Sequence, residues 1–179
     1  MTPITAASPS EPRYGWVLVG LGALSIGFQG GILLANALFL VAIAEDTGWP
    51  RATIAGAISL LVLGNAAWSP VVGWLIQRHG SRWVMPPAAL VLGLGLFLLS
   101  RARSPLELAA IMLLLLPPGA VGAGTLANYA AIQGWFQRRR GTALALADAG
   151  SALGGLVVVP FVGWLIGAHG WRGAYQGLA

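Results

Sequence analysis

Five apolar runs, each long enough to cross a lipid bilayer as a helix, strongly constrain the fold of this sequence. They lie near residues 14–44, 53–76, 83–100, 105–136 and 141–168. A membrane-spanning helix needs about 20 mostly apolar residues, whereas the strands of a membrane barrel alternate polar and apolar side chains over about ten. The runs therefore predict an all-α fold, a polytopic transmembrane helical bundle in contact with the lipid bilayer.

Composition excludes the main alternatives to a membrane protein. Apolar residues make up 57% of the chain and charged residues 8%, whereas a soluble domain carries about 25% charged residues. Such a chain cannot cover a surface that faces water, and it is too hydrophobic to be disordered. All ten basic residues are arginines in short clusters between the runs, so the net charge of +5 does not indicate nucleic-acid binding.

The residue types that support catalysis or metal binding are scarce. There is no cysteine, which removes disulfides and thiolate metal sites, and the two histidines fall in loops without metal-ligand spacing. An enzyme that works inside the membrane would need a nucleophile or a metal set, and neither is present. We therefore expect no enzyme activity, no metal and no cofactor.

The arginines also predict an orientation. The amino-terminal tail and the second and fourth connections hold six arginines, whereas the first, third and fifth hold four together with three acidic residues. Arginine-rich connections stay on the cytoplasmic side of a membrane. We therefore expect a cytoplasmic amino terminus, with residues 1–13 as a cytoplasmic tail.

A sixth apolar run opens at Trp171 but ends at Ala179. Its nine residues would extend about 13 Å as a helix, and the hydrocarbon core of a bilayer is about 30 Å thick. We therefore expect residues 14–179 to form five complete spans plus the start of a sixth, with the sequence truncated inside that span.

The second connection carries a recognisable motif. Residues 73–82 read GWLIQRHGSR, which resembles the loop signature of the major facilitator superfamily at Gly73, Arg78, Gly80 and Arg82. The glycines would serve close helix packing and a tight turn, and the arginines a cytoplasmic location. Gln77 replaces the acidic residue of that signature, which weakens the charged latch it forms in the family. The alternative is a basic turn that only sets orientation.

A second and longer stretch, residues 135–154, reads WFQRRRGTALALADAGSALG. It resembles the signature between the fourth and fifth spans of the monocarboxylate and oxalate/formate transporter-like branch. This resemblance implies the first half of a major facilitator fold, a six-helix bundle whose partner is a missing carboxy-terminal half. It further implies a bacterial-type inner membrane location.

The function implied by that resemblance is secondary active transport of small organic solutes by alternating access. The substrate class would be monocarboxylate-type anions, moved together with a proton in some members. The alternative from the residues is a non-transporting half-transporter or membrane scaffold that pairs with another chain.

Polar side chains inside the runs are the candidate site residues. Gln29 and Asn36 share one face of the first run, and Asn128 and Tyr129 lie in the fourth. They are candidate contacts in the substrate cavity, or alternatively hydrogen-bonding groups between helices. Asp148 is the one ionisable residue well inside a run, so it is a candidate for proton coupling or a structural polar contact. Near it, Gly150 and Gly154 form a small-residue face suited to close helix packing.

Overall fold

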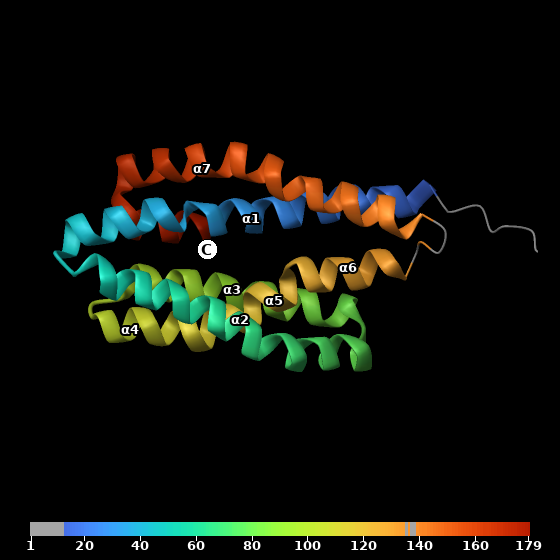
Figure 1. Ribbon diagram of the computed structural model, residues 1–179, viewed down its shortest axis with the longest axis horizontal. Helices are drawn as coiled ribbons and strands as arrows, with labels where there is room; N and C mark the ends of the chain where they lie inside the picture. The colour runs from blue at the N-terminus through green and yellow to red at the C-terminus, as the bar shows by residue number, and fades with distance from the viewer. Residues whose placement is uncertain (1–12, 135, 137–138) are drawn as a thin grey trace, which may run out of the picture.

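The computed structural model describes residues 13–134, 136 and 139–179, and it is a bundle of long, nearly antiparallel helices (Figure 1). Three helices are continuous: α1 (Arg13–Thr47), α2 (Arg51–His79) and α3 (Ser81–Arg101). A fourth span, Pro105–Gln133, is built from four segments, and α7 (Arg140–Leu178) completes the bundle. These five helices are long and apolar enough to cross a membrane, so the prediction of an all-α bundle with five spans is confirmed.

The fourth span is interrupted twice. It consists of α4 (Pro105–Ala110), the π-helix η1 (Ile111–Leu115), α5 (Leu116–Ala123) and α6 (Thr125–Gln133). Prolines 117 and 118 follow the π-helix, and because they lack an N–H they cannot continue the ordinary hydrogen-bond ladder. Adjacent prolines inside an apolar run indicate a bend in the helix. The second interruption, at Gly124 with φ −92° and ψ −150°, was not predicted.

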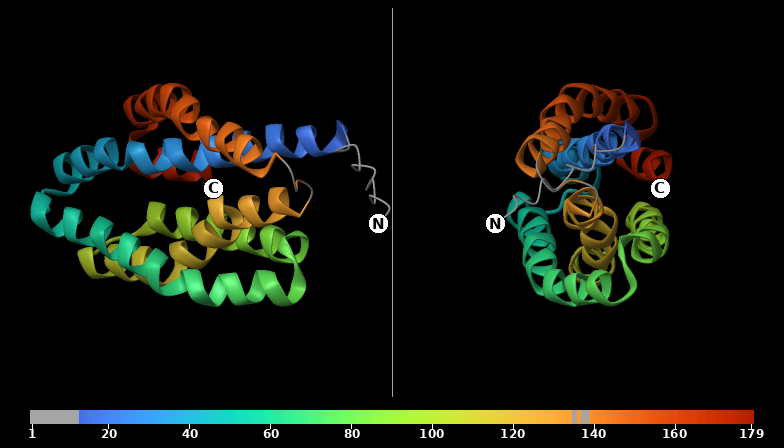
Figure 2. Two further views of the ribbon diagram at one scale, coloured as in Figure 1. Left: turned by 45° about the vertical axis from the view of Figure 1, so that its right-hand side comes forward. Right: turned by 90° about the vertical axis from the view of Figure 1, so that its right-hand side faces the viewer.

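A kink divides α7 into a long and a short limb. Gly170 interrupts this helix with φ 70° and ψ 173°, a left-handed φ that favours glycine because no Cβ is present. The chain reverses there, so that residues 171–178 run back beside the first part of α7 (Figure 2). Trp171, Ala174, Tyr175 and Leu178 of this short limb are buried in the main hydrophobic core.

The bundle has two groups of helices. In Figures 1 and 2, α1 and α7 lie together on one side and the second, third and fourth spans on the other. Glycines allow the close approach of α1 and α7: a Cβ on Gly27 would lie 2.6 Å from the carbonyl oxygen of Gly150, and a Cβ on Gly154 would overlap the Gly27 carbonyl group. Gly150 in turn lies against the backbone of Ala23.

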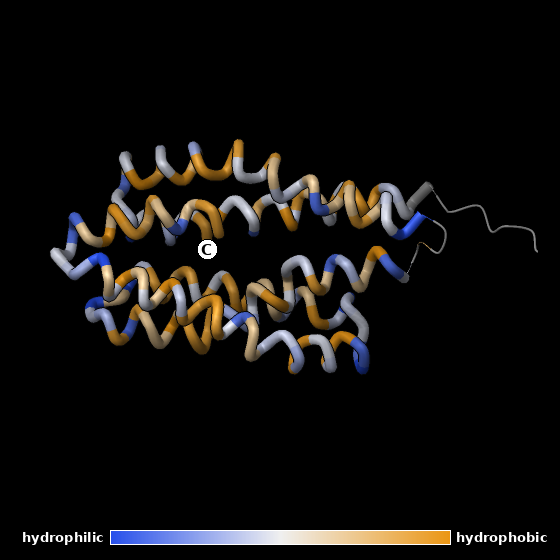
Figure 3. Tube along the Cα trace, in the orientation of Figure 1, coloured by the Kyte–Doolittle hydropathy of each residue, from blue (hydrophilic) through white to orange (hydrophobic). Residues whose placement is uncertain are grey.

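Hydropathy follows the expected membrane axis. Hydrophilic residues concentrate at the two ends of the bundle and hydrophobic residues between them (Figure 3). Large apolar side chains such as Leu24, Leu90 and Leu156 are more than 70% exposed in the bare protein. A water-soluble protein rarely presents so much apolar surface, so these faces contact lipid or other membrane helices.

The charged connections are divided between the two ends of the bundle as the sequence predicted. The α2–α3 turn and the start of α7 lie at the same end as the start of α1, and the α1–α2, α3–α4 and Gly170 turns lie at the other (Figure 1). Arg78, Arg82, Arg139 and Arg140 therefore share one end. Which end faces the cytoplasm stays a prediction, as does the tail at residues 1–12, which lies outside the described residues.

Candidate functional site

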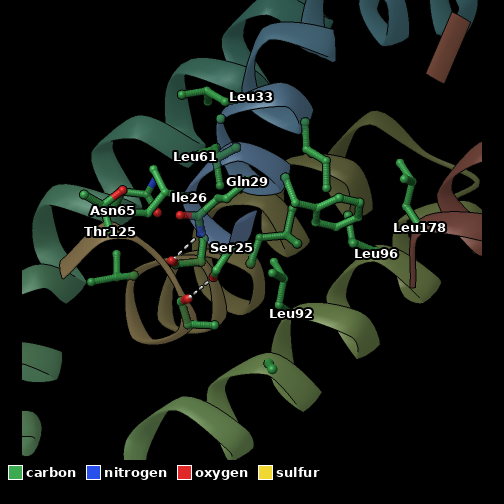
Figure 4. A pocket seen from close by; sticks show the side chains of 18 of the residues that line it. Ser25, Ile26, Gln29, Leu33, Leu61, Asn65, Leu92, Leu96, Thr125 and Leu178 are labelled. Carbon is green, nitrogen blue, oxygen red and sulfur yellow. Dashed lines mark hydrogen bonds between the residues drawn. The ribbon is translucent and has the colours of Figure 1, made fainter. Parts of the chain in front are cut away.

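A cavity of about 620 Å³ lies between α1, α2, α3, the fourth span and the two limbs of α7 (Figure 4). Its wall is mostly aliphatic. Its polar or ionisable lining residues are Ser25, Gln29, Asn36, Asn65, Ser69, Thr125, Asp148, Ser151 and Tyr175. Among the described residues that line it, none is basic and one, Asp148, is a carboxylate. The cavity therefore offers an apolar surface with neutral hydrogen-bonding groups and a single acid.

The helix break at Gly124 is held by polar side chains from α1 and α6. The side-chain nitrogen of Asn128 donates to the carbonyl oxygens of Gly124 at 3.0 Å and Ala123 at 3.3 Å, and to the Ser25 hydroxyl at 3.1 Å. Asn128 is 6% exposed and does not line the cavity. Sequence reasoning placed it among the substrate contacts, but the structure commits its amide to carbonyl groups at the interrupted helix.

Gln29 supports the same break from the other side. Its side-chain nitrogen donates to the carbonyl oxygen of Ala120 at 2.5 Å, and its amide leaves no room for a Cβ at Gly124. Gln29 nevertheless lines the cavity (Figure 4). It therefore joins the cavity wall to the irregular backbone at Gly124 inside the fourth span, where an unpaired carbonyl would be costly.

Two buried polar atoms in residues that line the cavity have no hydrogen-bond partner within the described part of the chain. They are the side-chain oxygen of Asn65 on α2 and the hydroxyl of Tyr175 on the second limb of α7. Tyr175 is 2% exposed, and its ring stacks on Phe39 with centroids 4.0 Å apart. Unpaired buried polar groups are rare in native proteins. These two atoms are therefore the polar groups beside the cavity that lack a hydrogen-bond partner in the described chain.

Sequence reasoning did not single out Tyr175, because it falls in the short run after Gly170, where no periodicity can be read. Asn36, which it did predict, lines the cavity on α1.

Tyr129 and Asp148 come from different spans and meet. The Tyr129 hydroxyl of α6 lies within hydrogen-bonding reach of the carboxylate of Asp148 on α7. Asp148 lines the cavity, whereas Tyr129 lies behind it and is half-buried. The sequence predicted both residues as candidates but gave no sign that they form a pair.

The loop motif lies at one end of the bundle, away from the cavity. Gly80 has φ 82°, and its N–H donates to the Ile76 carbonyl at 2.8 Å, which makes the tight turn expected there. Arg78 and Arg82 are exposed, and Arg78 lies over the Trp74 ring at 5.3 Å. The close packing expected at Gly73 is not seen, because a Cβ there would meet no described atom within 4 Å. Among the described residues, Gly73 therefore makes no close helix contact.

The opposite end holds a polar cluster that sequence reasoning missed. One carboxylate oxygen of Asp46, at the end of α1, accepts hydrogen bonds from the Trp171 indole and the Arg172 guanidinium, each at 2.8 Å. Arg172 also donates to the Ala102 carbonyl at 3.3 Å. The cluster fixes the Gly170 turn against α1 and the α3–α4 connection. Only the pairing of distant loops reveals it, since no local motif contains it.

Comparisons with known proteins agree with this geometry. The family described as Major Facilitator Superfamily matches residues 15–179. Monocarboxylate transporter 11 of Mus musculus is 33% identical over 97% of this chain and 38% of its own length. Monocarboxylate transporter 2 of Homo sapiens is 31% identical over 98% of this chain and 37% of its own length.

A more distant relative is riboflavin transporter RibJ of Trypanosoma brucei brucei, which is 24% identical over 98% of this chain and 33% of its own length. The chain thus spans less than two fifths of the length of the curated relatives it matches.

Proposed function

The chain belongs to the major facilitator superfamily, and on that premise we propose that it is the amino-terminal bundle of a secondary active transporter of small organic solutes. The solutes are monocarboxylate-type anions, moved by alternating access between two bundles that rock about a site near the middle of the membrane. The protein is a multi-pass membrane protein. We place it in a bacterial-type inner membrane with its amino terminus on the cytoplasmic side.

The observation that carries this proposal is the cavity itself. Its volume of about 620 Å³ lies within the range of about 300–1,000 Å³ that is typical of small-molecule sites. A mostly apolar wall with a few neutral polar groups suits the body of a small organic solute. A scaffold without transport activity would not need a cavity of this size lined by polar side chains such as Asn36 and Thr125.

The chemistry of the cavity wall also indicates which part of the solute this bundle contacts. No basic residue lines the cavity among those described, and an anion in an apolar site needs a positive partner. The carboxylate end of the solute therefore faces away from this bundle, toward the carboxy-terminal half. Neutral polar side chains of the cavity wall, such as Asn36 and Thr125, hydrogen-bond the hydroxyl or keto oxygen of the solute.

Transport by the purified full-length protein in proteoliposomes tests the proposal. Proteoliposomes are loaded with unlabelled lactate, and labelled L-lactate is added outside. Exchange is then followed in the presence of butyrate, oxalate or riboflavin as competitors. We expect exchange above that of protein-free liposomes, with competition by butyrate and weaker competition by the dianion oxalate. Absence of exchange with every monocarboxylate tried would contradict the proposed function, and competition by riboflavin alone would reassign the solute.

A further inference from the structure

We propose that Gln29 links solute binding to the shape of the fourth span, because its amide alternates between the carbonyl oxygen of Ala120 and a solute in the cavity. This exchange lets the helix break at Gly124 close and reopen, which moves α6 relative to α5. The inference rests on the proposed transport function and names a positioning residue and a moving element for it. It stands on the contacts of Gln29, which lines the cavity and also holds the interrupted helix.

Side chains replace backbone donors at the break. In an unbroken α-helix each carbonyl accepts a hydrogen bond from the N–H four residues later, so the carbonyl of Ala120 would pair with the N–H of Gly124. Here the Gln29 amide donates to the Ala120 oxygen at 2.5 Å instead (Figure 4). The Asn128 side chain likewise donates to the carbonyl oxygen of Ala123 at 3.3 Å. The span can therefore stay broken inside the membrane, where an unpaired carbonyl is costly.

The Ala120 carbonyl thus has two alternative donors, the Gln29 amide and the N–H of Gly124. When φ and ψ of Gly124 take helical values, α5 and α6 join into one helix and the backbone N–H becomes the donor. The carbonyl keeps one hydrogen bond in both arrangements, and glycine changes its backbone conformation at low steric cost. The released Gln29 amide then pairs with an oxygen of the solute. A solute that binds the released amide therefore shifts the span toward the continuous helix.

The packing of the fourth span indicates which part moves. A Cβ on Gly119 of α5 would lie 2.5 Å from the backbone nitrogen of Leu92 on α3, so backbone meets backbone there and leaves little room for sliding. Ile132 of α6 instead packs through its side chain in a cluster with Val19 of α1 and Ala147 of α7. Side-chain contacts adjust more easily than backbone contacts, so we expect a change at Gly124 to move α6 while α5 stays on α3.

The surroundings of Gly124 allow the two arrangements to be separated by one substitution. A Cβ at this position would overlap the Gln29 amide and the Ala120 carbonyl oxygen in the broken helix. In a continuous helix a Cβ points away from the backbone ladder, and alanine has the highest helix propensity. Gly124→Ala should therefore favour the continuous helix even without solute.

Distances between spin labels in otherwise cysteine-free full-length protein, measured by pulsed electron paramagnetic resonance in proteoliposomes, test the inference. One label is placed at Gln133→Cys, at the end of α6, and the other at His79→Cys, at the end of α2; both positions are exposed. The control pair is His79→Cys with Arg103→Cys, an exposed position in the α3–α4 connection. Both pairs lie within this bundle, so rocking of whole bundles changes neither distance. Saturating lactate should shift the first distance and leave the second unchanged.

Two variants identify the residues responsible for the shift. Gln29→Met keeps the length of the side chain but cannot donate, so lactate should no longer shift the Gln133–His79 distance. Ser151→Ala removes a different polar group from the cavity lining and should retain the lactate-dependent shift.

Gly124→Ala should shift the Gln133–His79 distance in the absence of lactate, in the direction that lactate produces in the wild type. The matched control is Gly56→Ala on α2, where an added Cβ meets no described atom within 4 Å, and it should leave the distance unchanged.

Lactate exchange measured on the same protein separates this inference from the proposed function. Exchange without a shift in the wild type, or with an unchanged shift in Gln29→Met, would overturn the inference and leave the transport function intact. A shift in Gly124→Ala without exchange of any monocarboxylate would support the two arrangements and contradict the function. Absence of both would overturn both. Where Gly124→Ala does not fold, the wild type and Gln29→Met decide the question.

Discussion

Gly154 of α7 lies so close to Gly27 of α1 that a Cβ added at Gly154 would overlap the carbonyl group of Gly27. Backbone thus meets backbone at this crossing, without side chains between the helices. Membrane helices gain most from packing of this kind, because lipid offers them no hydrophobic drive to associate. The contact joins the first and fifth spans into one unit, and it sets the cavity wall to which both helices contribute.

Replacing Gly154 with valine should therefore destabilise the bundle. Overpacking costs about 1–3 kcal/mol, and we expect the upper end because the opposing group is backbone and cannot rotate away. Thermal unfolding in detergent, followed by size-exclusion chromatography, measures the loss. Gly167→Ala on the same helix is the control: it has no atom within 4 Å of an added Cβ and should be neutral or slightly stabilising. Equal losses in both variants would contradict the packing argument.

Asn128 and Asn36 should separate stability from solute binding. Asn128→Ala removes the donor for the Ser25 hydroxyl of α1 and for two carbonyl groups at the Gly124 break, and hydrogen bonds between membrane helices are worth about 1–2 kcal/mol at most. We expect a loss of that order in thermal stability. Asn36→Ala, on the cavity wall, should leave stability nearly unchanged and raise the KM for lactate. A loss of thermal stability in Asn36→Ala together with a raised KM in Asn128→Ala would contradict both assignments.

Gly80 and Gly73, the two glycines of the loop motif, should respond differently to the same substitution. Gly80→Ala forces a Cβ into a left-handed conformation at φ 82°, which costs roughly 1–2 kcal/mol. Gly73→Ala meets open space in this half and should leave thermal stability unchanged or higher by up to about 1 kcal/mol through better helix propensity. Equal destabilisation would show that Gly73 packs tightly after all.

The two histidines test the orientation. His79 is exposed at the arginine-rich end and His169 at the opposite end, and the 179 residues contain no cysteine to obscure a label. In intact cells, a membrane-impermeant maleimide should modify His169→Cys and spare His79→Cys until the membrane is opened. Labelling of His79→Cys from outside would place the amino terminus on the outer side.

The sequence predicts the spans well because the hydrocarbon core imposes length and apolarity on each run. The prediction that a further apolar run opens at Trp171 follows from the same pattern. The break at Gly124 could not be read, since a glycine inside an apolar run is more often a packing residue than an interruption. The hydrogen bonds of Asn128 could not be predicted for the same reason: its partners include carbonyl groups that become free only at the break.

The candidate site was predictable in part. Spacing alone placed Gln29 and Asn36 on one helix face, and both line the cavity. Pairs between distant spans, such as Tyr129 with Asp148, depend on how helices pack, and no pattern in a single sequence records that. Tyr175 could not be predicted from the sequence, because eight residues of helix are too few to show the periodicity of a buried face.

Protection of a cavity cysteine by solute tests the central claim, that this cavity binds a monocarboxylate, most directly. Asn36→Cys is introduced into otherwise cysteine-free full-length protein in membranes, and its reaction with a small methanethiosulfonate reagent is timed with and without lactate. Ser104→Cys, in the turn before α4 and outside the cavity, is the control. We predict that saturating lactate slows modification of Asn36→Cys at least fivefold and leaves Ser104→Cys unaffected. Equal rates at Asn36→Cys with and without lactate, and with butyrate or pyruvate in its place, would contradict the account.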